Sequence, residues 1–340
     1  MKGPQITQKN ARVKRREKMK RNVITCLAVA CFFFLAAGAY GADYPTKPIN
    51  FICPWPAGGS SDMGSRILAQ TAEKKIGQSI VVSNKVGAGS QIGLTELARS
   101  KPDGYTIGLV NFPALNAIML NPERKALFNI DSFTPIVCQV VDPGLIFVKT
   151  DSPYKTLKDV LEDAKKRPGE VTASTSGILG VSHLSILMLQ EAAGVKFRIV
   201  HYDGGAPQMT ALLGGQIDVT FDNVGGVPPK IKAGLVRPLA LLDRERTRFI
   251  PDVPTTVELG FPSVINASVR GVMGPKGLPA PILKRLQEVF LEAMKSQEHM
   301  DMMDKGGLTV RPMVGAEYLK YRDEVHERLK RFVAIALEAK

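Results

Sequence analysis

Short apolar runs and amphipathic stretches alternate along residues 44–340 of this chain of 340 residues. The apolar run at 49–52, bounded by Pro48 and Pro54, is typical of a buried strand. After it, Met63, Ile67 and Leu68 fall on one face of a predicted helix. The same patterns predict further strands at 79–84, 105–111, 132–141, 145–150, 171–174, 197–202, 217–221, 236–242 and 268–273, and further helices at 94–99, 157–166, 182–193, 209–213, 281–295 and 316–339.

Strands that alternate with helices in this way predict an α/β fold with parallel sheets covered by helices on both faces. Pro143 and Gly144 are predicted to break the chain between two successive strands, 132–141 and 145–150. The mature length of about 300 residues suffices for two domains of ordinary size.

The first strand runs into a Gly-rich turn, residues 53–62, with the sequence CPWPAGGSSD. Ser60, Ser61 or Asp62 can cap the following helix, because their side-chain oxygens accept hydrogen bonds from its first N–H groups. Gly58 and Gly59 expose N–H groups beside the positive end of the helix dipole, which favours a bound carboxylate or phosphate without any Lys or Arg. A purely structural turn is the alternative, since an isolated Gly-rich turn is weak evidence for a site.

The first 42 residues have the pattern of a secretory signal peptide. Residues 1–21 are polar and basic, and residues 23–39 are almost wholly apolar and end in small residues at 37–39. Met19 can itself open a signal peptide of normal length, so residues 1–18 are interpreted as an over-long start. An uncleaved anchor is the alternative, because the apolar run is near the lower limit for a membrane span.

Removing the leader changes the charge balance. Residues 1–42 hold nine basic residues and one acidic residue, so 36 of the 45 Lys and Arg and 31 of the 32 Asp and Glu remain, and the formal net charge falls from +13 to about +5. The remaining Lys and Arg are scattered and form no stripe, which argues against nucleic-acid binding. The spacing of Cys and His matches no metal site, and no cofactor is expected. Cys53 and Cys138 are expected to be buried free thiols, although export would permit a disulfide.

Residues 87–93, with the sequence GAGSQIG, follow a strand and precede a helix, as a dinucleotide-binding loop does. They lack the G-x-G-x-x-G spacing, and Asp103 lies in a Pro-Asp-Gly turn instead of at a strand end. A tight loop that caps a helix is the favoured interpretation.

Residues 174–183, with the sequence STSGILGVSH, repeat the strand–turn–helix arrangement with hydroxyl groups in place of proline. Ser182 and His183 suggest a hydrolase, with Asp203 or Asp222 as the third member of a triad. Adjacent side chains at a helix start point apart, and no G-x-S-x-G elbow is present. We therefore favour a helix cap that also donates to a ligand, and expect no enzyme activity.

A series of motifs runs in order through residues 44–340. They are YPTKPI at 44–49, PWPAGG at 54–59 with Asp62, NK at 84–85 with GAG at 87–89, PDGYT at 102–106, SH at 182–183, YDGG at 202–205, GGQID at 214–218 and DVPTTVELG at 252–260. Together they resemble the Bug-type receptors, which are the periplasmic solute-binding proteins of the tripartite tricarboxylate transporter family. So many matches in order are more specific than any one of them.

The resemblance implies a two-lobed α/β fold of the type II Venus flytrap kind, with parallel-rich sheets flanked by helices. Lobe 1 would comprise 43–143 and 267–340, lobe 2 would comprise 144–266, and the chain would cross between them near 141–144 and 266–268. In this family the ligand lies between the lobes, and loop N–H groups, hydroxyls and ordered water hold its carboxylate. Carried over by motif, the expected ligand-binding residues are Trp55, Ala57, Gly58, Gly59, Ser60 and Asn111 from lobe 1, and Ser176, Gly177, Ser182, His183, Tyr202 and Asp222 from lobe 2.

Departures from the family pattern narrow the expected ligand. Trp55 stands where Phe is usual, and its larger ring favours stacking on a flat molecule. Asp203 replaces a usual Lys and adds negative charge, which argues against a tricarboxylate. The expected ligand is a small mono- or dicarboxylate, including aromatic and amino-acid-like acids. A monomeric periplasmic receptor would deliver it to integral membrane transporter subunits, and a periplasmic sensor system is the alternative partner.

Overall fold

The computed structural model describes residues 44–338, so the predicted signal peptide lies outside it. The chain divides after Thr46, and the unit that begins at Lys47 contains the helices and strands described here. Its strands are β1 (Ile49–Cys53), β2 (Ile80–Asn84), β3 (Thr106–Phe112), β4 (Phe133–Lys149), β5 (Thr172–Thr175), β6 (Arg198–His201), β7 (Val219–Asn223), β8 (Val236–Leu242), β9 (Ala267–Pro275) and β10 (Val310–Val314). Its helices are α2 (Ser60–Ile76), α3 (Gln91–Arg99), α4 (Ala114–Met119), α5 (Leu157–Lys166), α6 (Val181–Ala193), α7 (Gly205–Leu213), α8 (Pro228–Lys232), α9 (Ala280–Lys295), α10 (Gln297–Lys305) and α11 (Gly315–Glu338), with 3₁₀ turns η1 (Ala88–Ser90), η2 (Pro122–Arg124) and η3 (Ile130–Ser132).

All of these strands belong to one sheet, in the order β2-β1-β3-β9-β4-β7-β5-β6, with β8 and β10 also paired to β4. The pairs β1–β2, β1–β3, β5–β6 and β5–β7 are parallel, as the alternation of strands and helices predicts. Each pair that includes β4 or β9 is antiparallel, so the sheet is mixed. Sequence alternation did not reveal this, because it carries no information about the direction of a strand that returns from far along the chain.

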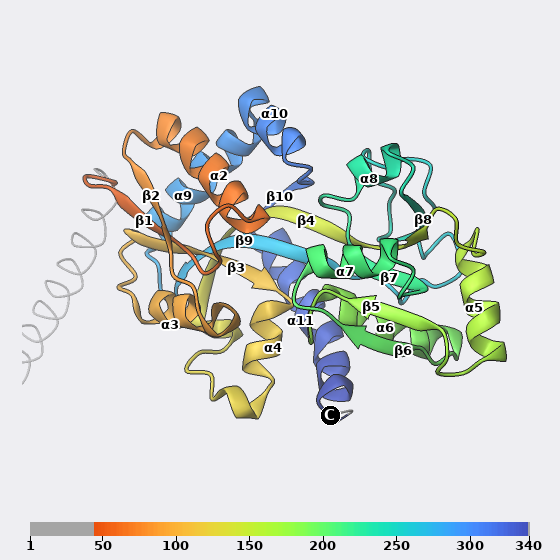
Figure 1. Cartoon of the computed structure of the whole chain (residues 1–340). Helices are drawn as coiled ribbons and strands as arrows, with labels where there is room; N and C mark the ends of the chain where they lie inside the picture. The colour runs from red at the N-terminus through yellow and green to blue at the C-terminus, as the bar shows by residue number, and fades with distance from the viewer. Residues whose placement is uncertain (1–43, 339–340) are drawn as a thin grey trace, which may run out of the picture. The chain divides into compact units, whose positions relative to one another are not determined.

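Strands β4 and β9 join two groups of strands (Figure 1). The prediction that Pro143 and Gly144 separate two strands is wrong, because β4 continues through both residues. Pairing with β9 ends at Pro143, and pairing with β7 begins at Gly144. Proline has no N–H to contribute to a ladder, so it fits where the strand changes neighbours. The N–H of Gly144 donates to the carbonyl of Asn266 at 2.9 Å, which keeps the backbone paired at this point.

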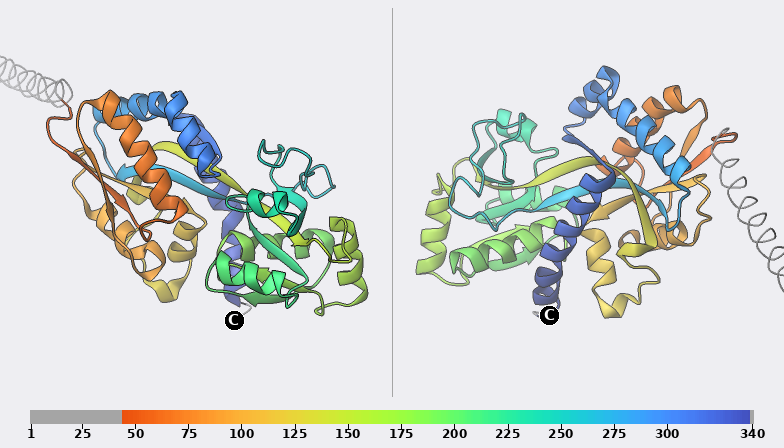
Figure 2. Two further views of the ribbon diagram at one scale, coloured as in Figure 1. Left: turned by 45° about the horizontal axis from the view of Figure 1, so that its top comes forward. Right: turned by 180° about the vertical axis from the view of Figure 1, so that it is seen from behind.

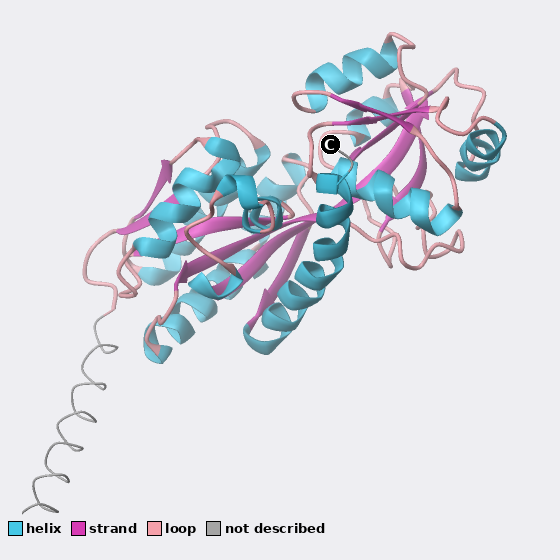
Figure 3. Cartoon of the chain, turned by 90° about the horizontal axis from the view of Figure 1, so that it is seen from below, coloured by secondary structure: helices cyan, strands magenta, loops and turns pink. Residues whose placement is uncertain are grey.

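Helices cover both faces of the sheet (Figure 3). The long helix α11 packs against β4, α4 and α6. It crosses behind the paired β4 and β9 in Figure 1 and in front of them in the right-hand view of Figure 2. One buried apolar cluster contains residues of both strand groups, among them Val110, Ile146 and Val269. Burial of this apolar surface stabilises the packing of the two groups.

Four elements were absent from the sequence prediction: α4, α8, α10 and β10. Helix α10 shows why, since only His299 and Met303 are buried along its length, and two positions give a weak periodic signal. Its start is nevertheless specified locally, because the hydroxyl of Ser296 accepts a hydrogen bond from the N–H of His299 at 3.3 Å.

Cys53 and Cys138 are buried and free, as expected. None of the helices within 44–338 is both long and apolar enough to span a bilayer.

Candidate functional site

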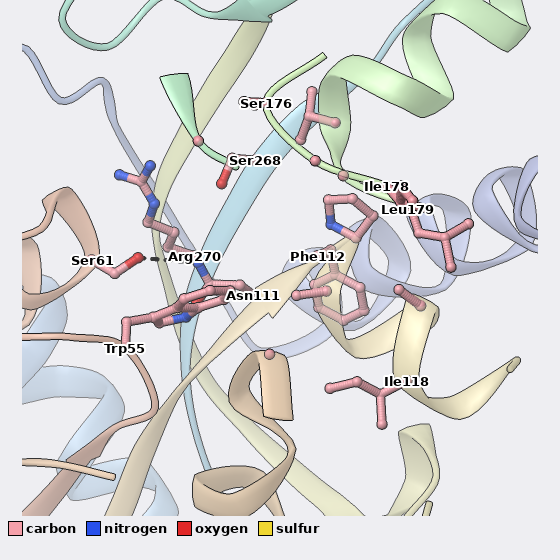
Figure 4. Close-up of a pocket in the computed structure, with 18 of the residues that line it drawn as sticks. Trp55, Ser61, Asn111, Phe112, Ile118, Ser176, Ile178, Leu179, Ser268 and Arg270 are labelled. Atoms are coloured by element: carbon pink, nitrogen blue, oxygen red, sulfur yellow. Dashed lines mark hydrogen bonds between the residues drawn. The ribbon is translucent and has the colours of Figure 1, made fainter. Parts of the chain in front are cut away.

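A cavity of about 760 Å³ lies among the ends of β1, β3, β5 and the middle of β9 (Figure 4). Its volume is typical of sites for small molecules. The structure brings five of the predicted residues to its wall, namely Trp55, Ser60, Asn111, Ser176 and Gly177. These five come from segments far apart in the sequence, on either side of the junction between Pro143 and Gly144.

The other predicted residues do not line this cavity: Ala57, Gly58, Gly59, Ser182, His183, Tyr202 and Asp222. Several of them instead hold the lining loops in place, as the hydrogen bonds below show. The first such loop is the Gly-rich turn before α2.

The buried carboxylate of Asp62 organises this turn from within. It accepts hydrogen bonds from the backbone N–H of Gly58 at 2.9 Å, from Nδ2 of Asn84 at 2.8 Å and from Nε of Arg66 at 3.0 Å. Burial works against ionisation of Asp62, but the hydrogen bonds from Arg66, Gly58 and Asn84 outweigh it and hold the pKa below its ordinary value. The N–H of Gly58, which the sequence suggested for a ligand, is therefore used inside the protein.

Asn84 also donates from Nδ2 to the carbonyl of Trp55 at 2.9 Å, so the same carboxylate network fixes the residue that carries the indole. Trp55 is half-buried against the cavity. Gly58 has φ of +81°, a left-handed conformation that favours glycine at this bend. Hydrogen bonds within the protein thus define the conformation of this turn.

The loop between β5 and α6 is held by the two residues that suggested a hydrolase. Oγ of Ser182 accepts a hydrogen bond from the N–H of Ser176 at 3.0 Å. Nδ1 of His183 accepts one from the N–H of Leu179 at 3.1 Å, and Leu179 has a left-handed φ of +60°. Both side chains are buried behind the loop.

Within the described part of the chain, no hydrogen bond joins Ser182 to His183. The imidazole of His183 packs edge-on against His201 with 4.7 Å between ring centroids. Burial, with a contribution from His201, lowers the pKa of His183 to about 4. This neutral, buried imidazole braces a backbone turn, an arrangement that differs from a nucleophile–base pair.

Asp222 and Tyr202 lie behind the next part of the wall, where Gly204 precedes α7 and Gly205 is its first residue. Oδ2 of Asp222 comes so close to Gly205 that a Cβ there would lie 2.9 Å from it. Burial raises the pKa of Asp222 to about 6, and the nearby carboxyl of Asp142 acts in the same direction. The backbone N–H of Tyr202 donates to the carbonyl of Thr175 at 2.9 Å, which ties the end of β6 to β5.

Sequence reasoning missed Arg270, which lines the cavity from β9. It is the register partner of Asn111 on β3, so both side chains project from the same face of the sheet. Nη2 of Arg270 lies 3.4 Å from Oδ2 of Asp142 on β4, and both side chains are buried. A signal was present in the sequence, because an Arg inside the apolar strand 268–273 demands a buried partner.

Apolar side chains that the sequence did not indicate form much of the remaining wall. They are Phe112, Pro113, Ile118, Ile178, Leu179 and Val181. Figure 4 draws Trp55, Ser61 and Arg270 on one side of the cavity and Ile178 and Leu179 on the other.

Three of the side chains at the cavity have buried polar atoms without a hydrogen-bond partner among the described residues. These atoms are Nε1 of Trp55, Oδ1 of Asn111, and Nε and Nη1 of Arg270. Nδ2 of Asn111 donates to Oγ of Ser61 at 3.3 Å, so only one end of its amide is paired. Buried polar groups are normally paired, and a cluster of unpaired ones at a cavity is typical of a binding site.

Comparison with known proteins agrees with this geometry. The family model described as tripartite tricarboxylate transporter family receptor, TctC, matches residues 65–336. The protein BugT of Bordetella pertussis is 33% identical over 294 residues, which cover 85% of this chain and 90% of BugT. A TctC solute-binding protein from Polaromonas, solved without ligand, superposes with a TM-score of 0.77 at 28% identity and covers 86% of this chain and 99% of its own.

Two further structures contain ligands. MatC from Rhodopseudomonas palustris, with bound malate, has a TM-score of 0.68 at 25% identity and covers 86% of this chain and 100% of its own. A second R. palustris protein, with adipate, has a TM-score of 0.71 at 27% identity and covers 86% and 98%. These relatives confirm the expected two-lobed α/β fold of periplasmic binding proteins. The chain therefore belongs to the tripartite tricarboxylate transporter receptor family and is a periplasmic solute-binding receptor.

Proposed function

We propose that this receptor binds a small carboxylate in the cavity between the Gly-rich turn and the β5–α6 loop, and delivers it to the membrane subunits of a tripartite tricarboxylate transporter. The observation that carries the proposal is the convergence of α2, α6 and α7 on one cavity, since Ser60, Val181 and Gly205 all line it at the first residues of these helices. Helix N-termini carry partial positive charge and free N–H groups, which favour an anion. The malate and adipate complexes of two relatives support a carboxylate ligand.

Within this proposal, residues 43–143 and 267–340 form lobe 1 and residues 144–266 form lobe 2. The change of strand partners at Pro143 and Gly144 supports a boundary there. Closure of the lobes would exclude water from the cavity and strengthen each polar contact with the ligand.

The predicted site residues then take two kinds of role. Trp55, Ser60, Asn111, Ser176 and Gly177 would contact the ligand directly, because they line the cavity. The remaining predicted residues would act by shaping the loops, as the hydrogen bonds accepted by Ser182 and His183 suggest: Ala57, Gly58, Gly59, Ser182, His183, Tyr202 and Asp222.

Tryptophan fluorescence provides the direct test, because Trp55 is the only Trp in the chain. Titration of the purified mature protein with malate, adipate and aromatic monocarboxylates should give a saturable change in fluorescence and a higher melting temperature. The Trp55→Phe variant should keep the melting shift and lose the fluorescence signal. If none of these acids changes either property, carboxylate binding at this cavity is refuted.

The transport role and the leader need separate measurements. Deletion of the gene should abolish uptake of the bound acid, whereas a sensor partner would leave uptake intact and abolish a transcriptional response. N-terminal sequencing of the exported protein should find a start near Asp43 or Tyr44 if the signal peptide is cleaved between Ala39 and Ala42, as its pattern predicts.

A further inference from the structure

Arg270 supplies a buried positive charge to a site whose expected donors were uncharged. Its side chain projects from the middle of β9, is only 7% exposed and lines the cavity beside Ser268. Burial lowers the pKa of its guanidinium, while Asp142 acts in the opposite direction. A buried charge needs a partner of opposite sign and hydrogen bonds for its donors.

Asp142 meets only part of this requirement. The contact between Oδ2 of Asp142 and Nη2 of Arg270 is long, at 3.4 Å, and Oδ1 of the same carboxylate accepts from the N–H of Gly225 at 3.1 Å. A guanidinium has five N–H groups, of which one is on Nε and two are on Nη1. Both of these nitrogens are buried and lack a partner among the described residues.

Asp142 contacts only Nη2 and can occupy one of its two N–H groups, so the other, together with the unpaired Nη1 or Nε beside it, leaves one edge of the guanidinium free to donate two hydrogen bonds to a carboxylate. None of the residues that line the cavity is an Asp or a Glu, so no acidic side chain of the wall competes for them. Nε1 of Trp55 is a further buried donor without a described partner at the same wall.

Among the described residues, the rest of the wall offers no second unpaired cationic side chain. The other cationic side chain of the lining, Arg124, already donates from Nε to Oε1 of Gln91 at 3.1 Å and from Nη2 to the carbonyl of Ala88. The side opposite Arg270 in Figure 4 carries Ile178 and Leu179. Moving a charged group against such apolar side chains costs free energy, whereas an apolar ring gains by leaving water.

We propose that Arg270 is the residue that binds the ligand carboxylate, and that the site selects acids with one carboxylate and a flat apolar body. This inference rests on the proposed carboxylate function and names its ligand class. Benzoate and phenylacetate are simple probes of that class, and the half-buried Trp55 supplies a ring for stacking on them.

The test changes both the ligand and the protein, and measures the binding affinity of each combination. Calorimetric titration at pH 7 compares benzoate with benzamide, which keeps the ring and loses the charge, on the wild type and on Arg270→Gln. Because Arg270→Gln leaves Asp142 buried without its cation, the double variant Arg270→Gln with Asp142→Asn is measured as well. Arg322→Gln is the matched control, since Arg322 is also about nine-tenths buried but pairs with Asp323 on α11, outside the cavity lining.

We expect the wild type to prefer benzoate over benzamide by about 10- to 100-fold, as a charge-assisted hydrogen-bonded pair predicts. Both Arg270 variants should lose this preference, while Arg322→Gln retains it. A preference that survives in the folded double variant would overturn the assignment of Arg270, and would leave it as a structural partner of Asp142. Tighter wild-type binding of malate or adipate than of benzoate and phenylacetate would overturn the ligand class.

The same panel separates this inference from the proposed function. If no acid binds the wild type, carboxylate binding itself fails and the inference fails with it. If acids bind the wild type and the Arg270 variants equally well, the receptor function stands and only the role of Arg270 is refuted.

Discussion

Replacement of Asp222 by Asn should stabilise the protein at neutral pH and leave it unchanged in acid. Burial raises the pKa of this carboxyl from 3.8 to about 6. This difference in pKa between the unfolded and folded chain corresponds to about 3 kcal/mol of free energy between the two protonation states. The folded protein thus carries a carboxylate at pH 7 that its surroundings disfavour.

The sign of the effect follows from the order of the two pKa values. Below pH 3.8 the carboxyl is protonated in both the folded and the unfolded chain, and the favourable contribution of Asp222 is fully present. As the pH rises towards 6, the unfolded chain ionises first, and stability is lost until the folded chain ionises as well. Asn stays neutral throughout and can still accept the hydrogen bond that Oδ1 receives from the N–H of Asn223.

Urea unfolding at pH 4, 5, 6, 7 and 8 measures the difference in the free energy of unfolding between the variant and the wild type. We expect a gain of about 1–3 kcal/mol at pH 7 that shrinks to near zero at pH 4. The control Asp203→Asn changes an exposed carboxyl on a neighbouring loop and should alter stability little at any pH. A difference for Asp222→Asn that does not vary with pH would refute the argument.

Three further predictions concern the groups that hold the lining loops. Asp62→Ala removes the acceptor of three hydrogen bonds and should lower the free energy of unfolding by about 2–4 kcal/mol in urea titrations, and a loss below 1 kcal/mol would contradict its role. Ser182→Ala deprives the N–H of Ser176 of its acceptor, so carboxylate affinity should fall by about 1–3 kcal/mol in the fluorescence titration. Unchanged affinity would show that this hydrogen bond does not contribute to ligand binding. His183→Gln keeps an acceptor for the N–H of Leu179 and removes a group whose pKa is lowered from 6.5 to about 4. As the pH falls from 6.5 to 4, the unfolded chain protonates His183 first, which costs the wild type about 3 kcal/mol of stability that the variant should not lose. An equally steep fall in the free energy of unfolding of the variant over this pH range would refute this.

The parts of the fold that the sequence predicted are those with a local signal. The strand at Ile49 and the helices that begin near Ser60 and Val181 follow from apolar periodicity and small polar residues at helix starts. The continuity of β4 through Pro143 was not predictable in this way, because it depends on pairing with β9 and β7. Strand β9 lies 120 or more residues later in the chain, and β7 lies about 80 residues later. A proline signals a break unless its neighbours in space are known.

The residues of the candidate site also differ in whether the local sequence indicates them. Trp55 and Ser176 were found because each belongs to a strand–turn–helix motif that is visible in the sequence. Phe112 and Ile178 look like ordinary core residues, and only the tertiary structure places them at a cavity. Arg270 was overlooked because a single charge in a strand has many explanations until Asp142 and Asn111 are seen beside it.

The two kinds of group at this site have complementary effects on binding. Asp62 and His183 hold the two lining loops through backbone N–H groups, and loops fixed in advance lose little entropy when a ligand binds. Arg270 lies on β9, which pairs along its length with β4, so its backbone is held by neighbours on both sides. If Arg270 binds the carboxylate as we infer, the charge of the ligand is recognised by a residue of the connecting strands, and the shape of its body is recognised by the loops. Selectivity among acids would then change through Trp55, Phe112 and Ile178, while Arg270 would be required for every acid that the receptor takes.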